Sequence, residues 1–191
     1  MRDIVKLGVI LMFYSLVAGT ALALVNLNSL PLIEKNRVEA ENNARAEVLP
    51  GMSGGYDMSD GDREFAYWTG YSDTEKAQPG GYIFIARGKG YSSTVETMVG
   101  VGRDGAITGL KVLFQQETPG LGARVSEILH GESEPWFTRQ FIGAADETAV
   151  MIRPDGGNID AITGATVTSR AVAASISSGL VALRQKVGGF R

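Results

Sequence analysis

The sequence predicts an α+β fold, in which an antiparallel sheet core and packed helices follow one N-terminal transmembrane helix. Three observations support this prediction. Residues 7–27 form an uncharged apolar run, β-rich segments cluster within residues 82–113, and a helical apolar pattern follows residue 166. Because strands and helices do not alternate as βαβ units, their order favours α+β over a parallel α/β sheet.

The apolar run at residues 7–27 predicts a transmembrane anchor over residues 1–30, since about 20 apolar residues cross the hydrocarbon core of a bilayer. A cleaved signal peptide is the alternative interpretation. Arg2 and Lys6 give a basic start, and Ala21-Leu22-Ala23 has the small-x-small form of a cleavage site. Basic residues lie on both sides of the run, so charge alone does not decide the orientation of the anchor.

A helical linker is expected over residues 31–50, ending at Pro50-Gly51, and a folded domain over residues 51–191. Within the domain, residues 51–63 and 70–80 are polar and are predicted as loops. The turn Arg103-Asp104-Gly105 predicts a hairpin between two strands. The remaining predicted elements are strands at 65–68, 82–86, 94–101, 107–113 and 148–153, and helices at 123–130 and 166–187.

The composition limits the chemistry that the chain can perform. It has no cysteine, which excludes disulfides, Cys-ligated iron–sulfur clusters and thiolate zinc sites. The net charge is −3 and no basic cluster stands out, so nucleic-acid binding is not expected. No metal site is expected either, because His130 is the single histidine and the acidic residues Asp57, Asp60 and Asp62 lack the closing glutamate of a calcium loop.

The segment Asp160-Ala-Ile-Thr-Gly-Ala-Thr-Val-Thr168 places small residues and hydroxyls where the last helix is predicted to begin. The first N–H groups of a helix lack intrahelical partners and carry partial positive charge, so a phosphate can bind there. An ordinary threonine-rich N-cap is the alternative. The apolar face of this helix is expected to enter the core through Val172, Ile176, Leu180 and Leu183.

A second motif, Gln116-Glu-Thr-Pro-Gly-Leu-Gly122, puts a carboxylate and a hydroxyl against a Pro-Gly turn after a predicted strand. Its two glycines permit close approach of the backbone to a flat ligand. A plain strand-to-helix turn is the alternative interpretation. Arg153 and Arg124 lie near the two motifs in sequence, where either could contact a phosphate or remain a solvated surface arginine.

These motifs, together with Gly90-Tyr91-Ser92 and Gly-x-Ile-x-Gly at 105–109, resemble the G subunit of the Rnf electron-transport complex. The related C subunit of the sodium-translocating NADH:quinone oxidoreductase shares the two motifs. The pattern Asp-x-x-Ser/Thr-Gly-Ala-Thr-x-Thr is similar to the signal at which a flavin transferase attaches FMN to threonine through a phosphodiester. The resemblance therefore implies a covalent FMN cofactor and a flavin transferase partner.

The resemblance also implies roles for individual residues. Thr166 would carry the FMN phosphoryl group, and Asp160 would belong to the transferase signal. The phosphate loop and helix start would be formed by Thr163, Gly164, Ala165 and Thr168. The flavin ring or its ribityl chain would be lined by Glu117, Thr118, Leu121 and Gly122.

The function implied by the resemblance is that of an anchored flavoprotein subunit. It would relay electrons in a complex that couples ferredoxin and NAD redox chemistry to ion translocation, and it would need other membrane subunits because it is not a complete enzyme alone. The C-terminal domain would lie on the outer, periplasmic side of the inner membrane. Alternatives are a subunit of the sodium-translocating NADH:quinone oxidoreductase, a freestanding anchored FMN-dependent reductase, and a cofactor-free binding module.

Overall fold

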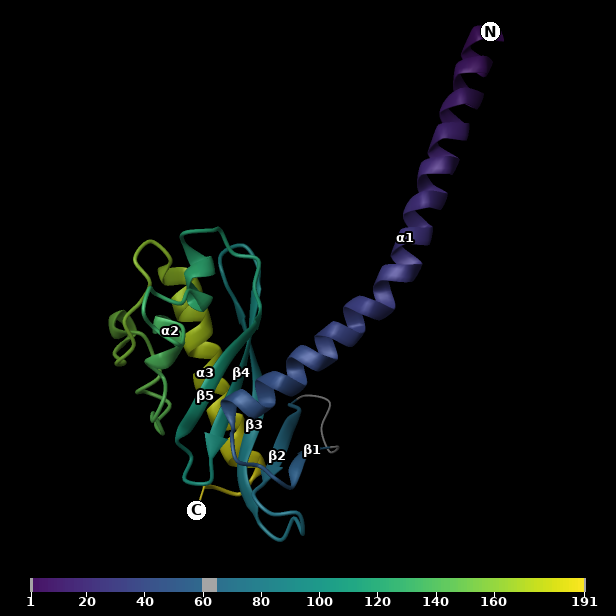
Figure 1. Ribbon diagram of the computed structural model, residues 1–191. Coiled ribbons are helices and arrows are strands. Elements are labelled where there is room, and N and C mark those ends of the chain that lie inside the picture. Colours follow the sequence, from purple (N-terminus) through teal and green to yellow (C-terminus); the bar gives the residue numbers. More distant parts are fainter. Residues whose placement is uncertain (1, 60–64, 191) are drawn as a thin grey trace. The chain divides into compact units, whose positions relative to one another are not determined.

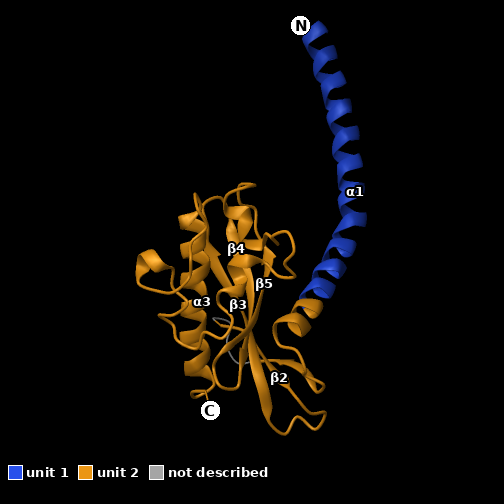
Figure 2. Cartoon of the chain, turned by 60° about the vertical axis from the view of Figure 1, so that its left-hand side comes forward, with its two compact units in different colours: residues 1–41 blue, residues 42–191 orange. Residues whose placement is uncertain are grey.

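The computed structural model of the chain describes residues 2–59 and 65–190 (Figure 1). The chain divides into two compact units, residues 1–41 and residues 42–191, coloured separately in Figure 2. The elements, in chain order, are α1 (Arg2–Val48), β1 (Gly55–Met58), β2 (Tyr67–Tyr71), β3 (Pro79–Lys89), β4 (Thr94–Gly102), β5 (Ile107–Phe114), the 3-10 helix η1 (Gly122–Ser126), α2 (Trp136–Arg139), the 3-10 helix η2 (Arg153–Asp155) and α3 (Thr166–Lys186).

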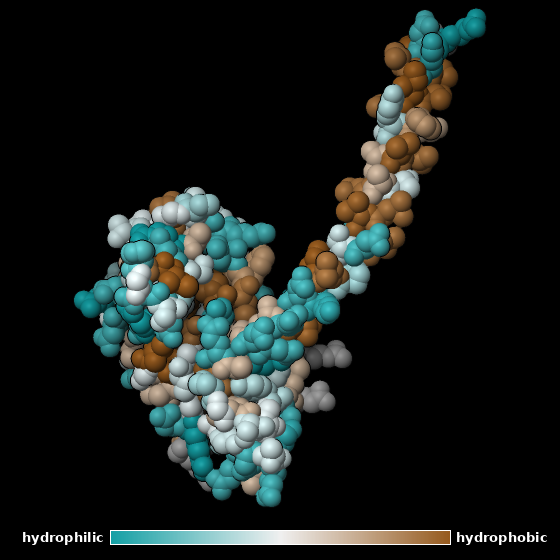
Figure 3. Space-filling view, in the orientation of Figure 1, coloured by the Kyte–Doolittle hydropathy of each residue, from teal (hydrophilic) through white to brown (hydrophobic). Residues whose placement is uncertain are grey.

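Helix α1 contains the predicted membrane anchor. Its most apolar 18-residue window has a mean hydropathy of 2.2 and none of that window is buried, so the helix is long and apolar enough to cross a membrane. Figure 3 shows this hydrophobic surface along the N-terminal part of the helix. A proline inside a helix removes one backbone hydrogen bond, yet α1 continues on both sides of Pro31. The apolar run and the polar helix predicted after it therefore form one element.

The sheet of the second unit is an antiparallel meander with strand order β1-β2-β3-β4-β5. Its longest ladder joins β3 to β4, from Gly81 opposite Gly102 to Lys89 opposite Thr94. The predicted hairpin between β4 and β5 is present, and Gly105 adopts a φ of 86° in its turn. The α+β prediction and its antiparallel core are confirmed.

Helix α3 packs against one face of this sheet (Figures 1 and 2). A glycine on each element permits the close approach. A Cβ atom on Gly179 of α3 would lie 2.1 Å from the Phe84 ring, and one on Gly88 of β3 would lie 2.3 Å from the Ala171 carbonyl oxygen. The predicted apolar face is confirmed as core, since its members are at most 1% exposed: Val172, Ile176, Leu180 and Leu183.

The opposite face of the sheet is covered by the last turn of α1, which belongs to the second unit. Val48 and Leu49 pack there with Ile83 and Met98. Thr108 Oγ1 donates a hydrogen bond of 2.6 Å to the Val48 carbonyl oxygen. The sheet thus separates two apolar layers, and the last turn of α1 is part of the folded domain.

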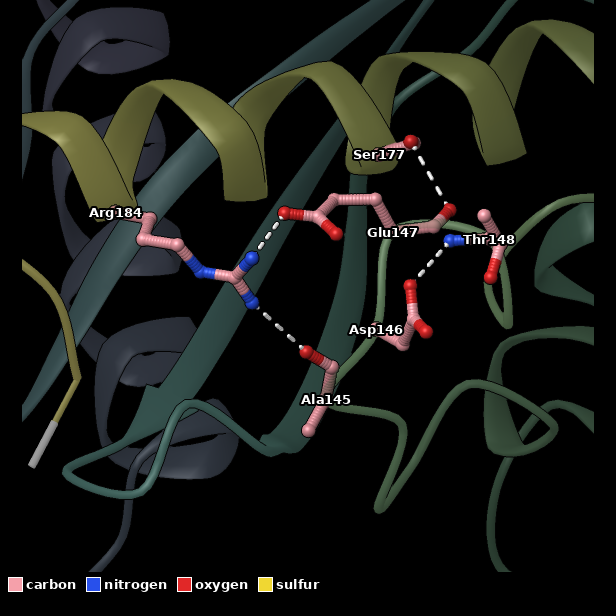
Figure 4. Close-up of polar contacts among 6 residues, drawn as sticks. All are labelled: Ala145, Asp146, Glu147, Thr148, Ser177 and Arg184. Carbon is pink, nitrogen blue, oxygen red and sulfur yellow. Dashed lines mark hydrogen bonds and ion pairs between the residues drawn. The ribbon is translucent and has the colours of Figure 1, made fainter.

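The segment 145–148 is bound to α3 through Ser177 and Arg184, as Figure 4 shows. Arg184 Nη1 donates to Glu147 Oε1 at 2.5 Å and Arg184 Nη2 to the Ala145 carbonyl oxygen at 3.2 Å. Ser177 Oγ donates to the Glu147 carbonyl oxygen at 3.1 Å. A hydrogen bond from the Thr148 amide lowers the pKa of the Asp146 carboxyl. These contacts hold a segment without regular structure against the core helix.

The two predicted loops are shorter than expected. Strand β1 lies inside the predicted loop 51–63, β2 extends to Tyr71, and β3 begins at Pro79 inside the predicted loop 70–80. The polar and glycine-rich sequence of these segments lacks the apolar pattern that predicts a strand. In β1, which is a half-exposed edge strand, hydrogen bonds to β2 rather than apolar burial define the element. Of the three aspartates considered as a calcium loop, Asp57 pairs with Lys76, and Asp60 and Asp62 lie outside the described residues.

Two predictions between β5 and α3 were wrong. The helix expected at 123–130 is only the 3-10 helix Gly122–Ser126, because Ile128 and Leu129 are exposed and supply no buried helix face. The strand expected at 148–153 is a turn with one isolated bridge, Ile152 to Ile159. Val150 and Ile152 are nevertheless fully buried, so their apolar character reflects core packing rather than strand pairing.

The close approach of α3 and β3 yields a testable prediction. Gly179→Ala raises helix propensity by about 1 kcal/mol, but its methyl group would overlap the Phe84 ring. We expect a net loss of about 1–3 kcal/mol in the free energy of unfolding, because overpacking a core costs that much. Thermal denaturation of the purified chain measures the loss.

Gly19→Ala is the matched control, since Gly19 also lies in a helix and a Cβ there would meet nothing within 4 Å. This control should leave the unfolding of the domain unchanged. Wild-type stability in Gly179→Ala would contradict the proposed role of Gly179 in helix–sheet packing.

Candidate functional site

One pocket of about 440 Å³ lies where three segments of the second unit meet. The segments are the turn after β3, the stretch that leads from β5 into η1, and the first turn of α3. The lining residues are Tyr91, Glu117, Thr118, Leu121, Gly122, Gly164, Ala165, Thr166, Val167 and Thr168. The two sequence motifs, which are separated by 37 residues in the chain, therefore form a single site.

The buried carboxylate of Glu117 joins these three segments. Its Oε1 accepts hydrogen bonds from the amides of Ser92 and Ser93 at 3.0 and 2.8 Å and from Ser93 Oγ at 3.0 Å. Its Oε2 accepts from the Tyr91 amide at 3.1 Å and from Thr168 Oγ1 at 2.7 Å. Five donors from this chain thus surround the two oxygens, so Glu117 lines the pocket chiefly as a positioning residue.

The hydrogen bonds also decide the ionisation of Glu117. Burial alone would raise the pKa of this carboxyl, which is 6% exposed. The hydrogen bonds from Thr168, Ser93 and Ser92 favour the charged form more strongly, and the pKa is lowered overall. Glu117 is therefore a carboxylate at neutral pH and adds a negative charge beneath the pocket wall.

Two glycines make room for the Glu117 carboxylate. A Cβ atom on Gly122 would lie 2.6 Å from Glu117 Oε2 and 2.7 Å from Thr168 Oγ1. A Cβ atom on Gly90 would lie 2.7 Å from Glu117 Oε1. Close contact with the chain's own carboxylate thus explains Gly90 and Gly122, whereas a Cβ atom on Gly120, the other glycine of the motif, would meet nothing within 4 Å.

The first turn of α3 presents backbone donors to the pocket. Its N-cap residue is Ala165, and no side chain of the described residues caps this end. The first intrahelical bond is donated by the Ser169 amide to the Ala165 carbonyl oxygen, so the preceding amides lack intrahelical acceptors. Gly164 reaches the helix with a φ of 78°, a conformation that other residues rarely adopt. An anion is favoured at this helix end.

The threonines of the motif have different surroundings. Thr168 is 1% exposed and its hydroxyl donates to Glu117. Thr166 is exposed and lines the pocket, whereas Thr163 is exposed but is not among the lining residues. Ser169 Oγ accepts from the Ile162 amide and donates to the Ala165 carbonyl oxygen, which fixes the backbone between these threonines.

Asp160 and Arg153 lie outside the pocket lining and pair with each other, with 2.9 Å between Asp160 Oδ1 and Arg153 Nε. Both side chains are exposed, so the pair contributes little to stability. Gln140 holds the Asp160 backbone through two hydrogen bonds, accepting from its amide at 2.8 Å and donating to its carbonyl oxygen at 3.3 Å. Arg124 pairs with Glu127. Neither arginine reaches the pocket in this arrangement.

Sequence reasoning missed three residues of this region. Tyr91 and Val167 line the pocket, although no role was assigned to either. Tyr91 belongs to the Gly90-Tyr91-Ser92 motif, but the sequence did not predict that it lies beside the other pocket residues. Gln140 gave no signal, because a single glutamine that follows a four-residue helix has no distinctive spacing.

The fold and the site define a class of protein. Backbone donors at an uncapped helix end suit a phosphate, and the apolar wall made by Leu121 and Val167 suits a flat organic group. Residues 90–181 match the FMN-binding domain family, and this range includes every residue of the pocket. The second unit thus contains an FMN-binding domain, and its residues fit that cofactor.

Comparison of whole chains gives the particular family. The chain is 32% identical over 199 residues to the G subunit of the Na(+)-translocating ferredoxin:NAD(+) oxidoreductase complex of Acetobacterium woodii, with 94% of this chain and 91% of that protein covered. It is 28% identical over 194 residues to the G subunit of the ion-translocating oxidoreductase complex of Pseudomonas aeruginosa, with 94% and 88% covered. The chain belongs to this family of G subunits, as its motifs predicted.

Among solved structures, the crystal structure of Shewanella oneidensis NqrC is similar to this chain. The two share 18% sequence identity and a TM-score of 0.46, and 70% of each chain is covered.

The Glu117 network yields a prediction about stability. Glu117→Gln replaces a fully bonded carboxylate by an amide whose NH₂ group would face backbone donors. We expect the free energy of unfolding at neutral pH to fall by about 2–4 kcal/mol, because buried donors lose a charged acceptor. Denaturant unfolding measures the change. Glu127→Gln, at a half-exposed ion pair, is the control and should change stability by less than about 1 kcal/mol.

The same variant should change the pH dependence. Because the folded-state pKa of Glu117 is lowered, its charged form stabilises the domain above the unfolded pKa, and this contribution is lost as pH falls through the folded value. Wild-type stability should therefore fall more steeply than that of Glu117→Gln below the ordinary pKa of a glutamate. Parallel pH profiles would contradict the role assigned to the carboxylate.

Proposed function

We propose that this chain carries FMN covalently, through a phosphodiester on Thr166, and relays electrons between other subunits of an ion-translocating oxidoreductase complex. The observation that carries the proposal is the position of Thr166, an exposed residue that begins α3 and lines the pocket organised by Glu117. Membership of the G-subunit family supports the redox role.

The surroundings of the threonines favour Thr166 as the attachment residue. An attachment hydroxyl must be accessible and next to the phosphate site. Thr168 is buried and its hydroxyl is engaged by Glu117, so esterification there would disrupt the network that forms the pocket. Thr163 is accessible but lies outside the pocket lining. Thr166 meets both requirements.

Each part of the site would hold a different part of the cofactor. The first amides of α3 would bind the phosphate, and Gly164 would keep the loop close to it. Leu121, Thr118 and Val167 would border the flavin and exclude water from part of its ring. When bound, FMN supplies one-electron and two-electron redox chemistry, which this cysteine-free chain otherwise lacks. The phosphodiester would prevent loss of the cofactor.

The exposed Arg153–Asp160 pair and the Gln140 clamp suggest how a flavin transferase recognises this loop. Gln140 fixes the Asp160 backbone at the surface, so the carboxylate is presented outside the pocket. The transferase would bind the Asp160 carboxylate while Thr166 accepts the FMN phosphoryl group. Helix α1 would anchor the domain in the inner membrane, with the domain on the periplasmic side.

The attachment residue can be tested by mass spectrometry. Thr166→Val removes the hydroxyl, so we expect the intact mass to lose one FMN phosphoryl adduct and the denatured band to lose its fluorescence under ultraviolet light. Thr94→Val is the matched control, because Thr94 is an exposed strand residue outside the pocket lining. Covalent flavin retained by Thr166→Val would overturn the assignment.

Thr163 should have a smaller effect. It precedes Gly164, whose positive φ turns the chain toward the pocket, so Thr163→Ala should lower the yield of attached FMN without abolishing it. The adduct fraction in the intact mass spectrum, together with the redox potential of the attached flavin, measures the effect. If both values matched the wild type, Thr163 would be only a structural residue.

A further inference from the structure

Tyr91 is an unusually exposed aromatic residue at the pocket. Its side chain is 78% exposed, the highest value among the large hydrophobic side chains of the described residues, including those of the apolar helix α1. Full exposure of an aromatic ring forgoes the burial that normally stabilises it. The position of Tyr91 among the lining residues therefore suggests that a bound group covers this ring.

The backbone of Tyr91 is held in place although its side chain is exposed. Its amide donates to Glu117 Oε2, the same oxygen that accepts from Thr168 Oγ1. The turn is closed by a bond of 2.8 Å from the Gly90 amide to the Ser93 carbonyl oxygen. One carboxylate oxygen thus joins the backbone of Tyr91 to the first turn of α3, where Thr166 lines the same pocket.

The chemistry of the wall agrees with a flat ligand. Leu121 and Val167 are 44% and 50% exposed in the same pocket, so a planar group entering it would bury apolar surface on several sides. Aromatic rings prefer offset-stacked or edge-to-face contacts with other π systems, which adds to the gain from burial. An isoalloxazine ring offers such a system.

We propose that Tyr91 contacts the isoalloxazine ring of the flavin and, through this contact, quenches its fluorescence and tunes its redox potential. This inference rests on the proposed function, which places FMN in the pocket. In the excited state, one electron passes from the phenol of Tyr91 to the flavin and then returns, so no net oxidation occurs. In the ground state, the electron-rich ring disfavours the reduced flavin, which carries more electron density.

The test compares two variants of Tyr91 in the full-length, flavin-loaded chain. Tyr91→Phe keeps the ring but removes the readily oxidised phenol, so the average fluorescence lifetime of the attached flavin should lengthen several-fold. Tyr91→Trp supplies another electron donor, so the lifetime should stay short. A merely structural role predicts no such opposite behaviour. Tyr91→Leu should also make the flavin potential less negative, because the π face is lost.

Tyr56→Phe is the matched control. Tyr56 donates its hydroxyl to the Leu49 carbonyl oxygen and packs in the apolar layer that contains the last turn of α1, so its loss should leave the lifetime unchanged. Equal lifetimes in the wild type, Tyr91→Phe and Tyr91→Trp, all loaded with flavin, would overturn the inference for Tyr91. A wild-type chain that carries no flavin would instead overturn the proposed function.

Discussion

The ionised Glu117 is the interaction on which the site depends. Its oxygens accept hydrogen bonds from the turn after β3 and from the first turn of α3. Its own backbone belongs to the third segment of the pocket, which leads from β5 into η1. A buried charge is stable only when it is well bonded, and here five donors from the chain meet that need. One carboxylate therefore joins the three segments that line the pocket.

Close packing of backbone and side chains gives this network its precision. Gly90 and Gly122 let the carboxylate sit against two chain segments, and Gly88 and Gly179 let α3 lie directly on β3. The position of α3 on the sheet and the position of the Glu117 carboxylate are thus fixed by close contacts. At each of these contacts, a single added methyl group would overlap other atoms. A site built on such packed elements holds its first helical turn, and with it Thr166, in a defined place.

The features that the sequence could predict are those encoded locally. The apolar spacing of Val172, Ile176, Leu180 and Leu183 predicted a buried helix face, and the Asp-Gly turn predicted the hairpin. Strand β1 escaped prediction, because an edge strand depends on a neighbour for its hydrogen bonds. The prediction of a strand around Val150 was wrong, because apolar residues can fill a core without pairing as a strand.

The candidate site also combines a part that is encoded locally with a part that depends on residues far apart in the chain. Residues 163–168 form a continuous stretch, so their motif predicted the start of α3, and Thr166 at that start lines the pocket. The partner of Thr168 is 51 residues away in the chain, and Ser93 is 24 residues from Glu117, so no local pattern identifies these contacts. Closing such loops costs chain entropy that only the completed sheet and core repay. The start of α3, where we propose that the phosphate binds, is thus a local structure, whereas the wall that holds Tyr91 and Leu121 exists only in the folded domain.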